Sequence, residues 1–272
     1  MPVALSVITA TCRRPELVVE AVRSALTQRA SLEVLVVDDD PAGSARAPIL
    51  AIAKEDPRVR YLTASPISNG VPALVYNQGL AQAQGRAVLF LDDDDVALPG
   101  AFAALLTALD QKPSRAFAFG LVEPFGGTPE VMTGEIAFFV DATARARAAL
   151  RSGTRLLLAH LVYGASPFVA SAAVFRRDAV NAVGGCDPAV RINTTIDLAA
   201  RLLQDHGWTL VDQPVCRYRV HADSLIHDPR NEADLVRSYV VMVRKLRARL
   251  GLVAWLRFRR YARRVRSGII AG

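Results

Sequence analysis

Cysteine is scarce in this chain of 272 residues. Its three cysteines, Cys12, Cys186 and Cys216, lie far apart, are odd in number and form no Cys-x-x-Cys pair. This distribution argues against a disulfide framework and against a cysteine-bound zinc site. It is typical of a protein from a reducing cytosol.

Two glycine-rich nucleotide-binding motifs are also missing. The turn after the first predicted strand reads Thr9-Ala10-Thr11-Cys12-Arg13 and has no glycine, whereas a dinucleotide-binding Rossmann fold needs G-x-G-x-x-G at that point. A P-loop motif is absent as well. The sequence therefore disfavours an NAD-dependent enzyme and a P-loop nucleotide-binding protein.

No segment has the pattern of a signal peptide or a membrane span. The first apolar run has no basic residue before it and ends at Arg13, which predicts a first strand. Residues 156–175 carry no formal charge, but Gly164 and Pro167 interrupt them, so we expect a helix, a turn and a strand there. We therefore expect a cytoplasmic protein.

The hydrophobic content of 51% is enough for a sizeable core, and the length suits one large α/β domain or two small ones. The net charge of +7 is unevenly distributed. Eleven of the 33 basic residues follow residue 236, with no acidic residue among them, so residues 1–236 carry 22 basic and 26 acidic side chains, a net charge of −4. The basic character therefore belongs to the tail.

Apolar runs alternate with helical patterns through the first 110 residues. Strands are predicted at 4–9, 32–37, 59–62 and 88–91, and helices at 15–28, 47–54, 73–83 and 101–109. This alternation predicts an α/β fold with a parallel sheet. The later pattern is less regular, with helices expected at 142–158, 177–183 and 198–204, a strand at 172–175, and tail helices at 238–266 that break near Gly251.

Two of the predicted strands end in clusters of carboxylates. Asp38-Asp39-Asp40 follows the second strand, and Asp92 to Asp95 follow the apolar run Val88–Leu91. The ends of parallel strands share one edge of the sheet, where ligands of open α/β sheets bind. Because buried carboxylates repel one another, a hard divalent cation such as Mg²⁺ or Mn²⁺ would stabilise such a cluster. A solvated acidic turn is the alternative for the second cluster.

An ordered set of short motifs extends this interpretation. They are Ser6-Val7-Ile8 with Thr11 and Arg14-Pro15-Glu16-Leu17, Val36-Val37-Asp38-Asp39, Asn69-Gly70 with Asn77 and Gly79, Phe90-Leu91-Asp92 with Asp94-Asp95, Arg176-Arg177 with Gly184-Gly185 and Asp187, and Tyr218-Arg219 with His221. Over about residues 3–225, the chain resembles a family 2 glycosyltransferase with the GT-A fold.

The resemblance implies a mostly parallel, Rossmann-like sheet flanked by helices. Residues 1–120 would form the half that binds a nucleotide-sugar. Residues 121–230 would form the acceptor-binding half of the same domain, and residues 231–272 the basic helical tail. The implied activity is inverting, metal-assisted transfer of a sugar from a nucleotide-diphospho-sugar, typically UDP-linked, to an acceptor hydroxyl.

The resemblance also implies roles for individual side chains. Thr11 and Asp39 would contact the nucleotide base, and Asp92 would lie near the ribose and diphosphate. The predicted nucleotide-binding residues are Thr11, Asp38, Asp39, Asn69, Asp92 and Asp93, and the predicted metal ligands are Asp92, Asp94 and His221. His221 could equally be structural. A divalent cation, Mg²⁺ or Mn²⁺, would stabilise the departing diphosphate.

The chain departs from the family at the expected general base. The family's Glu-Asp pair aligns with Thr194-Thr195, so the usual base is missing. Asp197 is the candidate we favour for that role, because a carboxylate within reach of a hydroxyl can accept its proton. Asp197 could instead cap or pair at the start of its helix. Asp187, His160 or a base outside these motifs are further candidates. An inactive protein is also possible.

Other features bear on partners. Tyr76 stands where family members often have arginine, beside Asn77. The tail carries aromatic and aliphatic residues among its arginines, which suits an anionic membrane surface on the inner face of the membrane, or packing against the domain with a solvated basic face. No nucleic-acid-binding module accompanies this charge. The acceptor could be a carbohydrate, a lipid-linked sugar or a small molecule.

Two rival functions follow from the same residues. One is a catalytically degenerate, membrane-associated nucleotide-binding protein, which the Thr194-Thr195 pair favours. The other is a nucleotidyltransferase, which would make a sugar nucleotide instead of consuming one. The nucleotidyltransferase is disfavoured because the chain lacks a glycine-rich, lysine-containing loop after the first strand.

Overall fold

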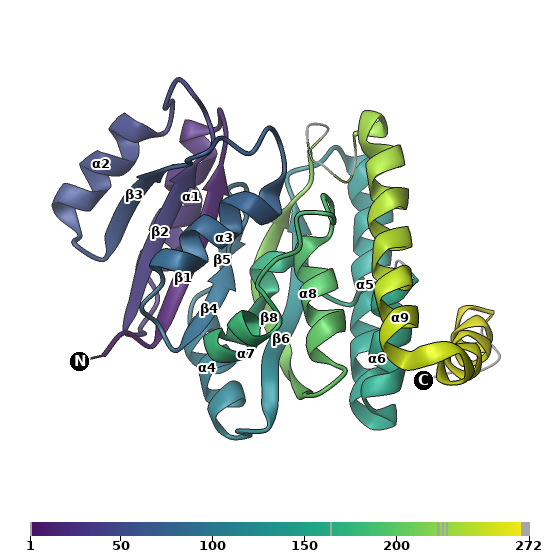
Figure 1. Ribbon diagram of the computed structural model, residues 1–272. Helices are drawn as coiled ribbons and strands as arrows, with labels where there is room; N and C mark the ends of the chain where they lie inside the picture. Colours follow the sequence, from purple (N-terminus) through teal and green to yellow (C-terminus); the bar gives the residue numbers. More distant parts are fainter. Residues whose placement is uncertain (1, 164, 222–223, 225, 227, 268–272) are drawn as a thin grey trace.

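A mixed sheet with helices on both faces forms the body of the protein (Figure 1). The computed structural model describes residues 2–163, 165–221, 224, 226 and 228–267, so the last five residues of the predicted tail lie outside the described residues. The described residues form an eight-stranded sheet in the order β3-β2-β1-β4-β7-β6-β8-β5. This arrangement confirms the predicted α/β class.

The first half of the chain alternates strands and helices as expected. In order it forms β1 (Leu5–Thr11), α1 (Pro15–Leu26), β2 (Leu32–Asp38), α2 (Arg46–Glu55), β3 (Val59–Thr63), α3 (Pro72–Gln82) and β4 (Ala87–Phe90). β1 pairs in parallel with both β2 and β4, and β2 pairs in parallel with β3. Every residue of β2 and β4 is buried, which explains why these strands read as continuous apolar runs.

The second half is less regular. It forms β5 (Val96–Ala97), α4 (Ala101–Asp110), β6 (Arg115–Phe125), α5 (Pro129–Ser152), α6 (Thr154–Val162), the 3₁₀ turn η1 (Ala170–Ala172), β7 (Ala173–Arg176), α7 (Arg177–Ala182), α8 (Thr194–Leu202), β8 (Gly207–Arg219), the 3₁₀ turn η2 (Pro229–Asn231) and α9 (Glu232–Arg266). β7 runs antiparallel between β4 and β6, and β5 runs antiparallel to β8, so the sheet is mixed.

Two long strands, β6 and β8, differ from the sequence-based expectation. They pair in parallel with each other, with register shifts around Gly120 and Leu121. β8 also carries Asp212, Gln213 and Pro214 at exposed positions in its middle. These polar residues and irregularities hide the alternation that would reveal a strand in the sequence.

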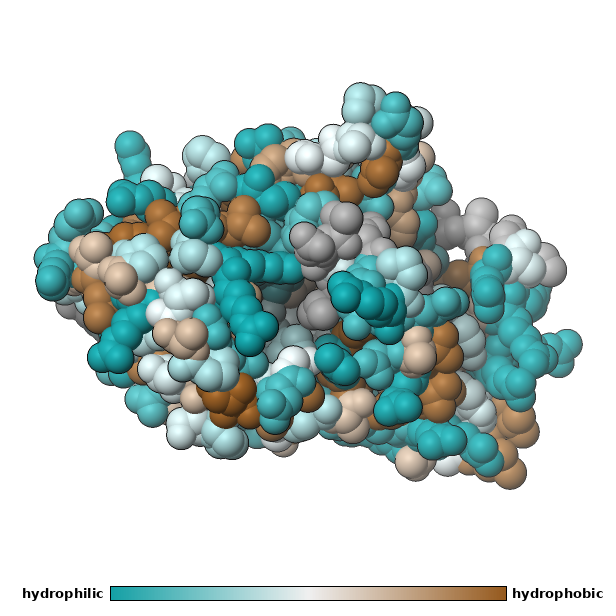
Figure 2. Space-filling view, turned by 90° about the horizontal axis from the view of Figure 1, so that it is seen from above, coloured by the Kyte–Doolittle hydropathy of each residue, from teal (hydrophilic) through white to brown (hydrophobic). Residues whose placement is uncertain are grey.

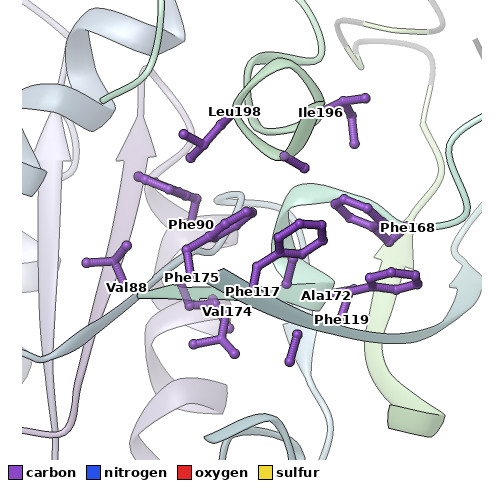
Figure 3. Packing of buried hydrophobic residues seen from close by; sticks show 14 of the residues in the cluster. Val88, Phe90, Phe117, Phe119, Phe168, Ala172, Val174, Phe175, Ile196 and Leu198 are labelled. Carbon is purple, nitrogen blue, oxygen red and sulfur yellow. The ribbon is translucent and has the colours of Figure 1, made fainter. Parts of the chain in front are cut away.

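Aromatic residues fill the core between the sheet and α8 (Figure 3). The rings of Phe117 and Phe175 lie 5.6 Å apart, and those of Phe119 and Phe168 lie 4.5 Å apart. Ile196 and Leu198 of α8 lie over these rings in Figure 3, and both are buried. The aromatic core therefore fixes α8 against β6 and β7, beside β4.

Two glycines with positive φ interrupt the helices in the second half of the chain. Gly153 has a φ of 92°, in the left-handed region, and separates α5 from α6. The single helix expected at 142–158 is therefore wrong: α5 begins earlier, at Pro129, and ends before Gly153. Gly251 has a φ of 71° and breaks α9, which confirms the expected break in the tail.

The first part of α9 contacts α8 and the segment that precedes it. Asp234 pairs with Arg191 at 2.7 Å, and Ser238 accepts a hydrogen bond from the backbone N–H of Ile192 at 3.1 Å. Lys245 contacts Asp197 at 3.2 Å. Beyond Gly251, the helix turns and extends away from the sheet (Figure 1). None of the helices in the described part of the chain combines the length and apolar character needed to cross a bilayer.

Two helical glycines offer a matched test of this packing. A Cβ on Gly79 of α3 would lie 2.4 Å from Cγ2 of Ile8 in β1, whereas a Cβ on Gly134 of α5 would meet nothing within 4 Å. Gly79→Ala should lower the free energy of unfolding by about 1–3 kcal/mol, because the core would be overpacked. Gly134→Ala should raise it by about 0.5–1 kcal/mol, because alanine favours the helix. Urea denaturation of both variants measures these changes, and equal effects would contradict the close contact of α3 with β1.

Candidate active site

The two carboxylate clusters leave the sheet at the same edge. Thr11 at the end of β1 is opposite Asp38 at the end of β2, and the backbone N–H of Asp39 donates to the carbonyl oxygen of Thr11 at 2.8 Å. On the other side of β1, the N–H of Leu91 donates to the carbonyl oxygen of Ile8 at 3.0 Å. The expected juxtaposition of the clusters at one sheet edge is confirmed. Figure 2 looks down on this edge.

The carboxylates of the first cluster, Asp38 and Asp39, accept hydrogen bonds from nearby loops and from β3. Asp38 is fully buried and accepts hydrogen bonds from the N–H of Asp40 at 3.0 Å and from the hydroxyl of Tyr61 at 2.9 Å. Asp39 accepts hydrogen bonds from both the N–H and the hydroxyl of Ser68, at 2.6 and 2.5 Å. Asn69 follows with a positive φ of 55°. These carboxylates hold the loops after β2 and β3 in place.

The second cluster connects β1, α1 and the end of β8. Asp93 accepts hydrogen bonds from the hydroxyl of Thr11 at 2.7 Å and from Nη1 of Arg14 at 3.2 Å. Asp94 lies 2.8 Å from the same Arg14 nitrogen and 2.8 Å from Nε2 of His221. The structure therefore brings Thr11 and His221, two residues singled out by the sequence, into contact with the cluster.

The remaining carboxylates of this cluster have neutral partners. The hydroxyl of Tyr76 donates to Asp92. Asp95 accepts hydrogen bonds from the hydroxyl of Ser171 at 2.6 Å and from the N–H of Arg219 at 3.0 Å. Nothing in the sequence indicates these roles of Tyr76, Ser171 and Arg14, because hydrogen-bond partners distant in sequence leave no local pattern.

Burial of this cluster raises the pKa values of its carboxyl groups. Burial, followed by the negative charge of Asp94, raises the pKa of Asp92 to about 7 and that of Asp93 to about 6. Burial and the charges of Asp92 and Asp94 also raise the pKa of Asp95 well above its usual value. Near neutral pH these carboxyl groups are therefore partly protonated, and a cation that binds there would displace protons from them.

A cavity of about 500 Å³ opens beside this cluster. Arg14, Tyr76 and the carboxylates of residues 92–94 are part of its lining. The rest of the lining is mainly apolar and comes from α5, the segment before η1, the start of α8 and the start of α9; it includes Phe138, Phe139, Phe168, Ile196, Leu235 and Tyr239. Thr11, Asp38, Asp39, Asn69 and His221 lie outside its lining as the described residues define it.

The position of Asp197 argues against the prediction that it is the general base. Its side chain is 1% exposed, and its two oxygens contact Nε of Arg201 at 2.7 Å and Nζ of Lys245 at 3.2 Å. Asp197 is not among the described residues that line the cavity, although Thr194 and Thr195 of the same helix are. Its carboxylate joins α8 to α9.

The other two candidate bases named from the sequence also lie outside the described cavity lining. Asp187 pairs with Lys245, which contributes to lowering its pKa. Burial, together with the charge of Arg145, lowers the pKa of His160 to about 4. Neither side chain is therefore positioned to take a proton from a ligand in this cavity.

The cluster fits a divalent cation in part. Carboxylate oxygens and an imidazole are suitable ligands for Mg²⁺ or Mn²⁺. Within the described part of the chain, however, no three side chains of His, Cys, Asp or Glu are grouped as a preformed metal site. A cation here would therefore need oxygens of a bound ligand to complete its coordination, as Mg²⁺ sites often do with phosphates.

Comparison with known proteins identifies the family. The model of the family described as Glycosyl transferase family 2 matches residues 6–184. This chain belongs to that family.

Curated relatives match over part of their length. One relative is the GalNAc(5)-diNAcBac-PP-undecaprenol beta-1,3-glucosyltransferase of Campylobacter jejuni. The two sequences are 33% identical over 132 residues, and this match covers 48% of this chain and 42% of that protein. A second relative is the putative colanic acid biosynthesis glycosyl transferase WcaA of Escherichia coli K12. It is 31% identical over 116 residues, and this match covers 42% of this chain and 41% of that protein. The matched region thus spans about two fifths of these relatives.

Solved structures confirm the GT-A fold. TarS 1-349 of S. aureus in complex with UDP matches with a TM-score of 0.62 and 16% identity, over 88% of this chain and 65% of that chain. The mannosyltransferase PcManGT of Pyrobaculum calidifontis, in complex with GDP-Man and Mn²⁺, matches with a TM-score of 0.58 and 15% identity, over 97% and 82% of the two chains.

The raised pKa of Asp92 makes the stability of the protein depend on pH. The folded state binds a proton at Asp92 more tightly than the unfolded state, so this stabilisation is present in acid and is lost as the pH rises through about 7. Relative to Asp92→Asn, the wild type should lose on the order of 2 kcal/mol of unfolding free energy between pH 5 and pH 8. Urea denaturation at both pH values measures this difference. A difference that does not change with pH would show that Asp92 is ionised throughout.

Proposed function

We propose that this chain transfers a sugar from a nucleotide-diphospho-sugar, UDP-linked, to an acceptor hydroxyl with inversion at the anomeric carbon. The observation that carries this proposal is the cavity at the sheet edge, whose lining combines Arg14 and the carboxylates of residues 92–94 with many aromatic and aliphatic side chains. Membership of the glycosyltransferase family supports the reaction class.

We assign donor binding to residues 1–120. Thr11 and Asp39 would contact the base, with Asp38 and Asn69 supporting this loop region, and Asp92 and Asp93 would lie near the ribose and diphosphate. Arg14 provides a positive charge that favours an anionic ligand near these carboxylates. The complexes of TarS with UDP and with UDP-GlcNAc support a UDP-linked donor.

A divalent cation, Mg²⁺ or Mn²⁺, would be held by Asp94 with Asp92 and His221, together with oxygens of the donor diphosphate. When bound, it would stabilise the negative charge of the leaving diphosphate, a contribution of several kcal/mol. The PcManGT complex with Mn²⁺ supports a cation in this fold. The contact of Asp94 with Nε2 of His221, and the position of residues 92–94 in the cavity lining, support it in this chain.

We assign acceptor binding to residues 121–230. The aromatic and aliphatic wall of the cavity favours an acceptor that carries an apolar group, and the side chain of Ile226 is 45% exposed beside the cavity. The undecaprenol diphosphate in the name of the C. jejuni relative supports a lipid-linked acceptor. A lipid-linked sugar is thus the acceptor class that we propose.

The second part of α9 would hold the protein on an anionic membrane surface. Leu252, Val253 and Leu256 are 51–64% exposed on its outer side. Exposed arginines follow on the same helix, at positions 257, 259, 260, 263, 264 and 266. Exposed apolar residues beside arginines suit the interface of a bilayer that contains anionic lipids. Such a location would bring the enzyme to a lipid-linked acceptor.

Turnover tests the proposed reaction. We expect release of UDP from at least one of UDP-glucose, UDP-galactose, UDP-GlcNAc and UDP-GalNAc when octyl glycosides are offered as acceptors with Mn²⁺. EDTA and the substitution Asp94→Asn should each lower the rate by at least about 100-fold, because both remove charge stabilisation of the leaving group. Unchanged turnover in EDTA would reject the role of the cation.

The rival function has its own outcome in this assay. Thr194 and Thr195 stand where the family has its base, which favours a nucleotide-binding protein without turnover. Such a protein would show a raised melting temperature with UDP and Mn²⁺, yet would release UDP from no donor.

Vesicle sedimentation tests membrane binding. The wild type should bind vesicles of phosphatidylcholine with 30% phosphatidylglycerol at least about tenfold more tightly than vesicles of phosphatidylcholine alone, because arginines attract anionic lipid. Leu252→Ser combined with Leu256→Ser should weaken binding severalfold. Val131→Ser on α5, which is also exposed, is the matched control. Equal binding to both kinds of vesicle would contradict the proposal.

A further inference from the structure

A sugar transfer with inversion needs a group that takes the proton of the acceptor hydroxyl. The residues singled out from the sequence do not supply it. Asp197 is paired with Arg201 and Lys245, and neither Asp187 nor His160 is among the described residues of the cavity lining. Thr194 and Thr195 line the cavity, but a threonine hydroxyl is not a base at neutral pH.

We propose that Glu135 of α5 is the general base of this enzyme, an inference that rests on the proposed function. Among the described residues that line the cavity, Glu135 is the only carboxylate outside residues 92–94. The carboxylates of residues 92–94 are held by Arg14, Thr11, Tyr76 and His221 at the end proposed for the diphosphate. Glu135 belongs to the wall assigned to the acceptor.

The helix geometry supports this position. Glu135, Phe138 and Phe139 are spaced three and four residues apart, so they share one face of α5, and all three line the cavity. The ring of Phe139 lies 5.6 Å from that of Tyr218, which also lines the cavity. The next residue, Arg219, donates its N–H to Asp95. α5 is thus packed against the end of β8 that contacts the carboxylate cluster.

The following turns of α5 are packed into the core of the protein. Ala142, Ala146 and Ala149 are buried at the spacing of successive turns, and Phe139 is buried as well. Glu135 itself is half-buried and lines the cavity. A base on a rigid element keeps its geometry through the reaction.

The step is balanced in atoms and electrons. The oxygen of the acceptor hydroxyl forms a bond to the anomeric carbon as the bond from that carbon to the diphosphate oxygen breaks. The electron pair of the broken bond leaves with the nucleoside diphosphate. The proton of the acceptor hydroxyl passes to the carboxylate of Glu135, from which solvent later removes it.

The test uses the full chain with the pair of UDP-sugar and octyl glycoside that gives the fastest UDP release. Glu135→Gln should lower kcat by at least about 100-fold, with melting temperature and affinity for UDP with Mn²⁺ unchanged. Glu135→Asp, which keeps a carboxylate, should retain more activity than Glu135→Gln.

Glu130→Gln is the matched control, because Glu130 lies on the same helix, is exposed and does not line the described cavity. It should keep wild-type activity. A Glu135→Gln variant with kcat within threefold of wild type, or a Glu135→Asp variant no more active than Glu135→Gln, would overturn the assignment of the base while leaving the proposed function intact. A wild type that binds UDP but releases it from no donor would overturn both.

Discussion

The buried carboxylates that follow β4 are the feature on which the rest of the site depends. Four acidic side chains leave one strand in succession, and their nearest partners are one shared arginine, several hydroxyls and an imidazole. Burial and mutual repulsion raise the pKa values of Asp92 and Asp93 towards neutrality. A cation that displaces these protons would be attracted both to the carboxylates and to a diphosphate, which is how a site made of acids would bind an anionic ligand.

The frame around this cluster uses one acid of α8 in structural ion pairs. The aromatic layer of β4, β6 and β7 fixes α8, and Lys245 and Arg201 use the carboxylate of Asp197 to join α8 and α9. Asp197 therefore stabilises the packing of α8 against α9. Glu135 of α5, in contrast, lines the cavity.

The sequence was informative where structure follows local pattern. β1 to β4 were predicted within a few residues, because fully buried parallel strands are continuous apolar runs. β6 and β8 were missed, since Asp212, Gln213 and Pro214 and the register shifts obscure β8. The shared sheet edge of the two acidic clusters followed from strand order alone.

What could not be predicted depended on tertiary contacts. The position of Asp197 in the sequence does not reveal that Lys245, 48 residues further on, would contact it. The hydrogen bond of Tyr76 to Asp92 and the approach of Phe139 to Tyr218 are of the same kind. Partners distant in sequence decide whether an acid is a structural ion pair or a group that faces a ligand.

A crystal structure of the protein with UDP and Mn²⁺, collected at a wavelength where manganese scatters anomalously, tests the central claim most directly. The account predicts an anomalous peak beside the carboxylate of Asp94, with the diphosphate of UDP against it in the cavity. A nucleotide bound elsewhere, or a diphosphate in this cavity with no cation beside Asp94, would contradict it.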